Sequence, residues 1–236
     1  MKIGGLQKVT LIDFPGRISC TVFLSGCNYL CPWCHNPELV LSELIKKHSP
    51  ISSKDFFQFL KERRKLLEGA CIGGGEPTIH PDLPEFCQKI KKLGYQIKLD
   101  TNGSNPKMLK DLIERKLIDY IAVDIKAPKE KYSEAIGFKG CINNYLLDKI
   151  EKSIDILKDG KIDYEFRTTL IPNLLNREDI LSIAQWIRPA KRYVLQNFRA
   201  GKTISAEFER TNPFSEEFLF SLKKAITPFF EIVELR

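Results

Sequence analysis

The stretch FLSGCNYLCPWCHNPE, residues 23–38, places three of the chain's seven cysteines within eight positions. Cys27, Cys31 and Cys34 follow a C-x3-C-x2-C pattern, and no fourth cysteine lies nearby. A structural zinc site usually has a second pair of ligands, so His35 or a distant cysteine would have to complete one here. Thiolates also hold iron–sulfur clusters, in which three protein ligands leave one iron open to a substrate. The pattern alone leaves both kinds of metal site open.

The composition is that of an ordinary globular protein. Of its 236 residues, 43% are hydrophobic and 28% charged, which predicts one substantial core rather than two α/β domains. No run approaches the roughly 18 apolar residues that span a membrane, and no signal-peptide core precedes the first strand. We therefore expect a cytoplasmic protein without a membrane partner. The formal charge of +7 is spread over predicted helix faces, so no nucleic-acid partner is expected.

Short apolar runs alternate with helical patterns along the chain. Strands are predicted at 17–24, 70–72, 96–99, 120–124, 164–170, 192–195 and 230–235, and helices at 53–68, 82–93, 106–116, 143–158, 177–187 and 215–226. This alternation predicts an α/β fold with parallel strands and outer helices. Six βα units are too few for a closed barrel, so we expect a partial, open (β/α)6 barrel of the TIM type, with a doubly wound sheet as the alternative.

The chain shows no linker that would divide it. We expect a single domain over residues 1–236, in which 1–16 form an N-terminal hairpin and 17–236 form the partial barrel. The polar segment 126–142 follows a strand and lies where a loop that covers a substrate would lie, although it could equally be plain surface.

A glycine-rich turn follows the second barrel strand. In CIGGGEPTIH, residues 71–80, three glycines precede Glu76. Glycines there let the backbone approach a ligand closely, and the carboxylate of Glu76 can receive a cationic amine. Alone this is a common turn signal. Beside the cysteine loop, at the carboxyl ends of neighbouring strands, it indicates a shared site.

These two motifs, in this order and after these strands, resemble the radical S-adenosylmethionine (SAM) superfamily. The resemblance implies that Cys27, Cys31 and Cys34 bind a 4Fe–4S cluster. The open iron of that cluster would take the amino and carboxylate groups of SAM, so the fourth ligand would be the cosubstrate. The expected fold is accordingly a partial barrel of the radical SAM type.

The same resemblance implies a set of SAM contacts. KLDTNGS and YIAVDIKAP would lie around the carboxylate and ribose of SAM, and the arginine of EFRTTLIPN would reach towards it. A monovalent cation is expected between the two aspartates, because they would otherwise repel each other. On the next strand, Gln196 or Asn197 would stand where related enzymes carry a histidine. The implied SAM-binding residues are Trp33 at the adenine, Gly74, Gly75 and Glu76 at the amino group, and Asp100, Thr101, Asp124, Lys126 and Arg167.

The opening DFPGRISC, residues 13–20, is similar to that of glycyl-radical-enzyme activating enzymes. There, Asp13 would approach the substrate's glycine loop, although Phe14 replaces the usual glycine. The resemblance implies an activase that cleaves SAM reductively and uses the 5′-deoxyadenosyl radical to generate a glycyl radical on a partner enzyme. No side-chain base is expected, because hydrogen-atom abstraction needs none.

The overall pattern is most similar to the longer form of anaerobic ribonucleoside-triphosphate reductase activating proteins. That likeness implies such a reductase as partner and a flavodoxin- or ferredoxin-type electron donor. Two alternatives remain open. One is a radical SAM enzyme acting on a small molecule, such as a deazapurine-forming synthase, and the other is a non-catalytic zinc-binding interaction module.

Overall fold

One curved, eight-stranded sheet organises the chain, and its strand order follows the sequence from β1 to β8. The computed structural model describes residues 1–138 and 144–236. Strand β1 pairs antiparallel with β2, and every later neighbour is parallel. The strands are β1 (Ile3–Thr10), β2 (Ser19–Leu24), β3 (Gly69–Gly74), β4 (Gln96–Thr101), β5 (Tyr120–Asp124), β6 (Asp163–Leu170), β7 (Ala190–Asn197) and β8 (Phe230–Leu235).

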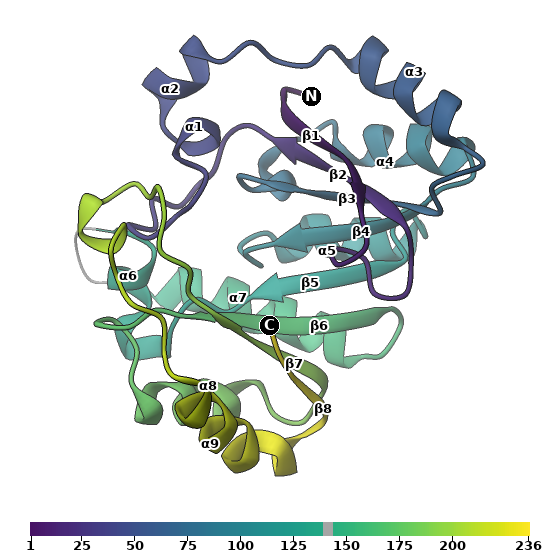
Figure 1. Cartoon of the computed structure of the whole chain (residues 1–236). Helices are drawn as coiled ribbons and strands as arrows, with labels where there is room; N and C mark the ends of the chain where they lie inside the picture. Colours follow the sequence, from purple (N-terminus) through teal and green to yellow (C-terminus); the bar gives the residue numbers. More distant parts are fainter. Residues whose placement is uncertain (139–143) are drawn as a thin grey trace.

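Helices cover the outer side of this sheet, and β1 and β8 remain its two edges (Figure 1). The predicted partial, open barrel is therefore confirmed over the doubly wound alternative. The helices are α1 (Pro37–Val40), α2 (Ser42–Lys47), α3 (Ser53–Arg63), α4 (Leu83–Lys92), α5 (Pro106–Glu114), α6 (Tyr132–Ala135), α7 (Asn144–Lys158), α8 (Arg177–Ile187) and α9 (Glu216–Ile226). No described helix is long and apolar enough to cross a membrane.

Side-chain caps set the starts of several helices. The side chains of Ser52, Asn105 and Asn176 each accept a hydrogen bond from the backbone of the following turn, which satisfies an otherwise unpaired N–H group. The helix predicted at 53–68 ends earlier, at Arg63, because the chain turns there to reach β3. Residue 143, the predicted first residue of another helix, lies outside the described residues.

The two faces of the strands differ in polarity, as the two-residue period of a strand requires. Along β4, Ile97 and Leu99 are fully buried in the hydrophobic core beneath the helices. The alternate residues Lys98 and Asp100 form an ion pair inside the barrel. The barrel interior is therefore charged, and it is this face that leads to the carboxyl ends of the strands.

The β1–β2 loop has a buried anchor at its centre. Phe14 is only 3% exposed, and a Cβ atom on Gly69 would lie 2.7 Å from its ring. The Phe14 ring also lies 6.1 Å from that of Tyr120, at the first residue of β5. Phe14 thus fills the amino end of the barrel, which explains an aromatic residue where related openings have glycine.

The segment predicted as a loop at 126–142 contains ordered helical turns. It includes a 3-10 turn at Lys129–Lys131 followed by α6. Tyr132 is fully buried, and the carbonyl of Ile136 accepts a hydrogen bond of 2.9 Å from Leu30 in the cysteine loop. Residues 126–138 therefore support the cysteine loop, and 139–142 lie outside the described residues.

Candidate functional site

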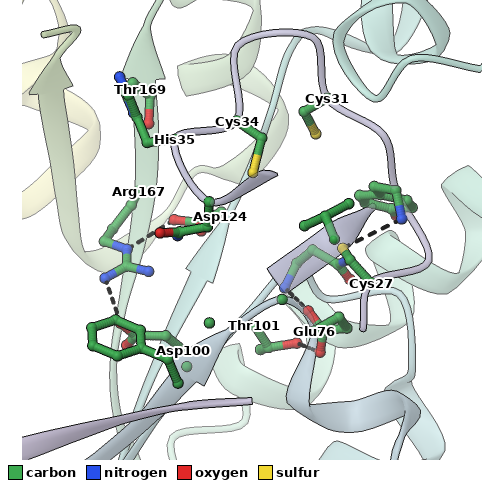
Figure 2. Close-up of a pocket in the computed structure, with 18 of the residues that line it drawn as sticks. Cys27, Cys31, Cys34, His35, Glu76, Asp100, Thr101, Asp124, Arg167 and Thr169 are labelled. Atoms are coloured by element: carbon green, nitrogen blue, oxygen red, sulfur yellow. Dashed lines mark hydrogen bonds and ion pairs between the residues drawn. The ribbon is translucent and has the colours of Figure 1, made fainter. Parts of the chain in front are cut away.

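A cavity of about 320 Å3 lies at the carboxyl ends of the strands, as Figure 2 shows. Except for Gln196 and Asn197, every residue predicted for the site lines it. These are Asp13, Cys27, Cys31, Trp33, Cys34, Gly74, Gly75, Glu76, Asp100, Thr101, Asp124, Lys126 and Arg167. Parallel strands bring these distant segments together because their carboxyl ends meet at one edge of the sheet.

The three cysteines of the β2–α1 loop are free thiols spread along one wall of the cavity (Figure 2). Burial raises the pKa of Cys27 to about 11 and that of Cys31 to about 12. Among the described residues, no three His, Cys, Asp or Glu side chains converge tightly enough to hold one metal ion. The three thiols instead lie apart along the cavity wall, which suits a cluster whose irons each take a separate thiolate.

Neighbouring polar residues hold this loop against the next strand end. The side-chain amide of Asn28 donates to Ser104 at 2.8 Å, and that of Asn102 donates to Asn28 at 2.9 Å. Tyr29 also lines the cavity, and its backbone N–H donates to the thiol of Cys27 at 3.4 Å. The sequence motifs did not predict Asn28, Tyr29 or Ser104 as site residues. Asn28 and Tyr29 lie between two cysteines of the motif, and Ser104 follows the end of β4, so sequence position was the signal that could have identified them.

Trp33 carries an unsatisfied polar atom in the cavity wall. Its indole Nε1 is buried and has no hydrogen-bond partner in the part of the chain that the structure describes. The ammonium group of Lys126 lies 5.0 Å from the centre of the Trp33 ring. A buried N–H group without a partner is unfavourable. A polar cofactor against this wall would satisfy it, so the donors present fit a cluster with SAM.

The buried carboxylate of Glu76 accepts hydrogen bonds from residues that follow β3 and from the end of β4. One carboxylate oxygen accepts from the backbone N–H and hydroxyl of Thr78 at 3.0 and 2.5 Å and from the hydroxyl of Thr101 at 2.6 Å. The other accepts from the backbone N–H of Asn102 at 2.6 Å. Burial raises the pKa of Glu76, while these hydrogen bonds oppose the rise. Glu76 thus ties β3 to β4 in addition to facing the cavity.

The glycines before Glu76 are required by the protein's own packing. A Cβ atom on Gly75 would lie 2.0 Å from the carbonyl oxygen of Gly26, and one on Gly74 would lie 2.5 Å from the backbone of Leu24. Gly74 also has a φ of +112°, which favours glycine. Residues 74–77 (Gly-Gly-Glu-Pro) are called the GGEP turn below. The backbone of this turn lies directly against the start of the cysteine loop.

Gly75→Ala is expected to destabilise the protein by about 1–3 kcal/mol, the usual cost of overpacking a tight contact. Gly73→Ala is the matched control, because its new Cβ would lie 3.5 Å from the nearest atom, which is an ordinary contact. Urea unfolding of both variants measures the difference. Equal stability of the two variants would show that the close approach of Gly75 to Gly26 is not required.

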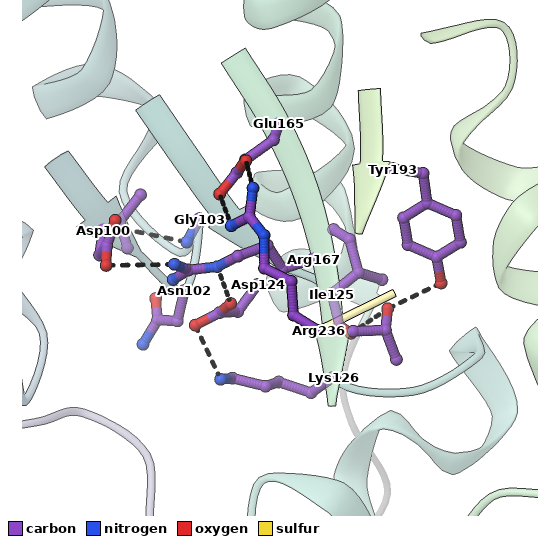
Figure 3. A network of polar contacts seen from close by, with 12 residues as sticks. Asp100, Asn102, Gly103, Asp124, Ile125, Lys126, Glu165, Arg167, Tyr193 and Arg236 are labelled. Carbon is purple, nitrogen blue, oxygen red and sulfur yellow. Dashed lines mark hydrogen bonds and ion pairs between the residues drawn. The ribbon is translucent and has the colours of Figure 1, made fainter. Parts of the chain in front are cut away.

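Five charged side chains form a continuous row of ion pairs at β4, β6 and the end of β5. Figure 3 shows the part of the row from Asp100 through Arg167 and Asp124 to Lys126. The guanidinium of Arg167 donates to Asp124 at 2.8 Å and to Asp100 at 3.1 Å. Lys98 pairs with Asp100 at one end, and Lys126 pairs with Asp124 at 3.2 Å at the other. Of the three cations, Arg167 and Lys126 line the cavity, where either can pair with an anionic group such as a carboxylate.

The row keeps both aspartates ionised. Burial by itself would raise the pKa of each, but Arg167 and Lys98 hold the pKa of Asp100 below its ordinary value. Arg167 and Lys126 likewise hold down the pKa of Asp124. The position predicted for a monovalent cation, between the two carboxylates, is occupied by the guanidinium of Arg167.

The remaining predicted residues lie at the open side of the barrel. Asp13 accepts a hydrogen bond of 2.5 Å from the hydroxyl of Thr21 and lines the cavity. Asn197 uses its side chain to hold the backbone of Phe214, with hydrogen bonds of 2.8 and 3.1 Å. Gln196 is the member of that pair whose side chain is uncommitted among the described residues.

Comparisons with known proteins agree with this geometry. The model of the radical SAM superfamily matches residues 21–187. A protein from Methanocaldococcus jannaschii that carries the name of a glycyl-radical enzyme activating enzyme is 32% identical over 235 residues, which cover 99% of this chain and 95% of that protein. A 7-carboxy-7-deazaguanine synthase from Thermococcus kodakarensis is 27% identical over 162 residues, or 61% of this chain and 60% of its own.

A solved structure extends the likeness to the fold. Streptococcus suis SuiB bound to the precursor peptide SuiA superimposes with a TM-score of 0.69, covering 91% of this chain and 48% of that one at 15% identity. At this identity only the fold is compared. The family model covers more than half of the chain, and the match to the Methanocaldococcus protein is nearly full length. The chain therefore belongs to the radical SAM superfamily.

Proposed function

We propose that this radical SAM enzyme activates a glycyl-radical enzyme. The proposal rests mainly on one observation. Residues of the cysteine loop, the GGEP turn and the charged row, together with Asp13, all line one cavity on the open side of the barrel. The likeness to a protein named for this activity over nearly the whole chain supports it. Membership of the superfamily favours an enzyme over the non-catalytic zinc-binding module.

The chain's own residues would hold and orient the cofactors. The thiols of Cys27, Cys31 and Cys34 would ligate a 4Fe–4S cluster. When bound, the cluster and SAM supply the reductive cleavage that yields a 5′-deoxyadenosyl radical. Arg167 and Lys126, the cations of the row that line the cavity, would attract the carboxylate of SAM. The Trp33 side chain, whose indole N–H has no partner among the described residues, would border the adenosyl group.

The turn around Glu76 completes the proposed SAM site. Carbonyl groups of Gly74 and Gly75 and the carboxylate of Glu76 would receive the amino group. Thr101 holds Glu76 in place through its hydroxyl. A monovalent cation is proposed only together with SAM. Once the SAM carboxylate gives Arg167 a new partner, K+ or Na+ would fill the space between the two aspartates.

Lys126→Gln is expected to weaken SAM binding by one to two decades, because a charge-assisted contact is worth about 1.5–3 kcal/mol. Lys129→Gln is the matched control, since Lys129 pairs with Glu151 outside the cavity. Isothermal titration of SAM into cluster-loaded protein measures both. Equal affinities of the two variants for SAM would exclude Lys126 from the SAM site.

The proposed monovalent cation is tested by repeating the SAM titration of the wild-type protein with tetramethylammonium in place of K+. An unchanged affinity for SAM would exclude the cation from the site.

We further propose an anaerobic ribonucleoside-triphosphate reductase as the partner, on the strength of the overall sequence pattern. The same pattern supports a flavodoxin- or ferredoxin-type electron donor. A reduced flavodoxin should then replace dithionite in the activation assay. Activation of another class of glycyl-radical enzyme with equal efficiency would argue against the reductase as the specific partner.

Reduced protein with SAM and its partner is expected to produce a glycyl radical, observed by electron paramagnetic resonance. Asp13→Ala should lower the radical yield while leaving slow, uncoupled SAM cleavage intact, because Asp13 lies at the open side and outside the charged row. Glu43→Ala, on α2 and away from the cavity, is the control. Absence of the glycyl signal with every glycyl-radical enzyme tested would favour the small-molecule alternative that the deazaguanine synthase match represents.

A further inference from the structure

Residues 198–214, called the strap below, connect β7 to α9 and reach the cysteine loop (Figure 1). The two ends of the strap are tied together by Asn197. Its side chain donates to the carbonyl of Phe214 at 2.8 Å and accepts from the N–H of the same residue at 3.1 Å. Surface loops with ends closed in this way are compact structures in their own right.

The interior of the strap is folded as well. The N–H of Gly201 donates to the carbonyl of Glu209 at 3.1 Å, and the hydroxyl of Thr203 donates to the carbonyl of Ser205 at 2.7 Å. Phe208 ends a 3-10 turn and is buried. The strap can therefore act as a fixed support for the segment that it contacts.

The strap contacts the cysteine loop at two residues that flank Cys34. Before this cysteine, the carbonyl of Pro32 accepts a hydrogen bond of 2.8 Å from the backbone N–H of Ser205. After it, the side chain of His35 lies against the first two residues of the strap. Cys34 is therefore held from both sides by the same support.

His35 makes two different contacts with the strap. Its Nε2 lies 2.8 Å from the carbonyl oxygen of Arg199, and because a carbonyl oxygen only accepts, this nitrogen carries the proton. The His35 ring also stacks on Phe198, with ring centroids 5.1 Å apart. Phe198 is only 1% exposed, so the histidine ring rests on a fixed part of the core.

The first half of the cysteine loop is held by other elements. Asn28, next to Cys27, is hydrogen-bonded to the segment that follows β4. The N–H of Leu30 donates to the carbonyl of Ile136 at 2.9 Å. Cys27 and Cys34 are thus fixed by different parts of the chain.

The open barrel explains why the second half of the loop is supported in this way. Strand β2 pairs with β1 and β3, whereas β7 lies towards the opposite edge of the sheet. Backbone pairing within the sheet therefore does not connect the cysteine loop, which follows β2, with the end of β7. The strap makes this connection.

We propose that the strap positions the Cys34 thiol for the cluster, and that His35 is the positioning residue that holds the strap on the cysteine loop. Residues that orient metal ligands commonly contribute about 10–100-fold to metal retention. The inference rests on the proposed function, because it presumes the cluster. It adds a residue outside the three ligands that determines how firmly the cluster is held.

Alkylation of the full chain without cofactors tests the proposal. Iodoacetamide at one pH, followed by peptide mapping with mass spectrometry, gives a separate rate for each cysteine. His35→Ala should raise the rate at Cys34 about tenfold, because a hydrogen bond and an aromatic contact are lost together. The rate at Cys27 should not change, and the fully buried Cys87 reports any global unfolding. His35 is exposed, so its truncation leaves the core intact.

Three further variants separate the two contacts of His35. His35→Phe keeps a ring on Phe198 without the hydrogen bond, and His35→Gln keeps a donor without the ring. Each should raise the Cys34 rate about threefold, because one of the two contacts remains. His48→Ala, which removes an exposed histidine at the end of α2, is the matched control and should leave every rate unchanged.

Two results of the alkylation experiment would overturn the proposal. One is an unchanged Cys34 rate in His35→Ala. The other is an equal acceleration at Cys27 and Cys34, which would show that His35 stabilises the whole loop or the whole fold. In cluster-loaded protein, His35→Ala should also release iron to the chelator bathophenanthroline about tenfold faster than the wild type.

The inference and the proposed function fail separately. Glycyl radical formation by the wild type, with no Cys34-specific effect of His35→Ala, would keep the activase and remove the role of the strap. A Cys34-specific effect in a protein that binds no iron would keep the role of the strap and argue against the activase.

Discussion

Cys31→Ala is expected to reduce the iron content of anaerobically reconstituted protein from about four atoms per chain to almost none. The three thiols are spread along one wall of the cavity, so each would ligate a different iron. The described chain offers no compact group of other ligands to compensate. Loss of one thiolate would leave two ligands, which do not retain a cubane cluster exposed to solvent. Cys27→Ala and Cys34→Ala should behave alike.

Cys87→Ala is the control for this experiment. Cys87 is fully buried in α4 and does not line the cavity, so its loss should leave the iron content unchanged. Iron and acid-labile sulfide analysis, with the brown absorbance of the cluster, measures the outcome. Full iron content in Cys31→Ala would overturn the assignment. Colourless protein that carries zinc would support the interaction module instead.

Arg167→Met is expected to destabilise the protein by about 1.5–3 kcal/mol, because each aspartate loses a charge-assisted hydrogen bond and keeps only one lysine as its cationic partner. Arg167 is only 11% exposed and bridges Asp100 and Asp124. Without the guanidinium, the two carboxylates face each other across the cavity. Urea unfolding of the protein without cofactors measures the effect. Arg177→Met, which removes only a surface hydrogen bond to Ser221, is the control.

The destabilisation should depend on pH in a defined direction. In the wild type the pKa of Asp124 is lowered, so its stabilising contribution is present above its unfolded pKa and is lost as pH falls through the folded value. In Arg167→Met each carboxylate loses one of its two cationic partners, so its pKa should be higher than in the wild type, and protonation then relieves the repulsion. The gap between variant and wild type should narrow as pH falls towards about 4. A gap that is constant from pH 8 to 4 would contradict this explanation.

The sequence contained enough information for the fold and for most of the residues that were predicted to meet at one cavity. The alternation of apolar runs and helical patterns predicts the strands because each strand of a parallel sheet is buried under helices. Polar residues directly after those strands, such as Glu76 and Asp124, then converge by topology alone. Boundaries were less predictable. Leu67 is buried like a helix residue, although α3 ends at Arg63.

The partners of those residues could not be predicted. Two aspartates at neighbouring strand ends indicate a cation between them, but the sequence does not tell whether it is a metal ion or Arg167 from the next strand. The glycines after β3 suggested room for a ligand, whereas Gly75 makes room for the backbone of Gly26. Such contacts depend on the relative placement of distant segments, to which local sequence patterns are insensitive.

The proposed activase function is tested most directly by the source of the hydrogen atom that is transferred to 5′-deoxyadenosine. The measurement is mass spectrometry of 5′-deoxyadenosine formed by reduced, cluster-loaded protein with SAM and a glycyl-radical enzyme that carries α-deuterated glycine. We expect one deuterium in the product, in proportion to the glycyl radical formed. Unlabelled 5′-deoxyadenosine with the deuterated partner, together with deuterium uptake from a labelled small metabolite, would show that the chain acts on a small molecule instead.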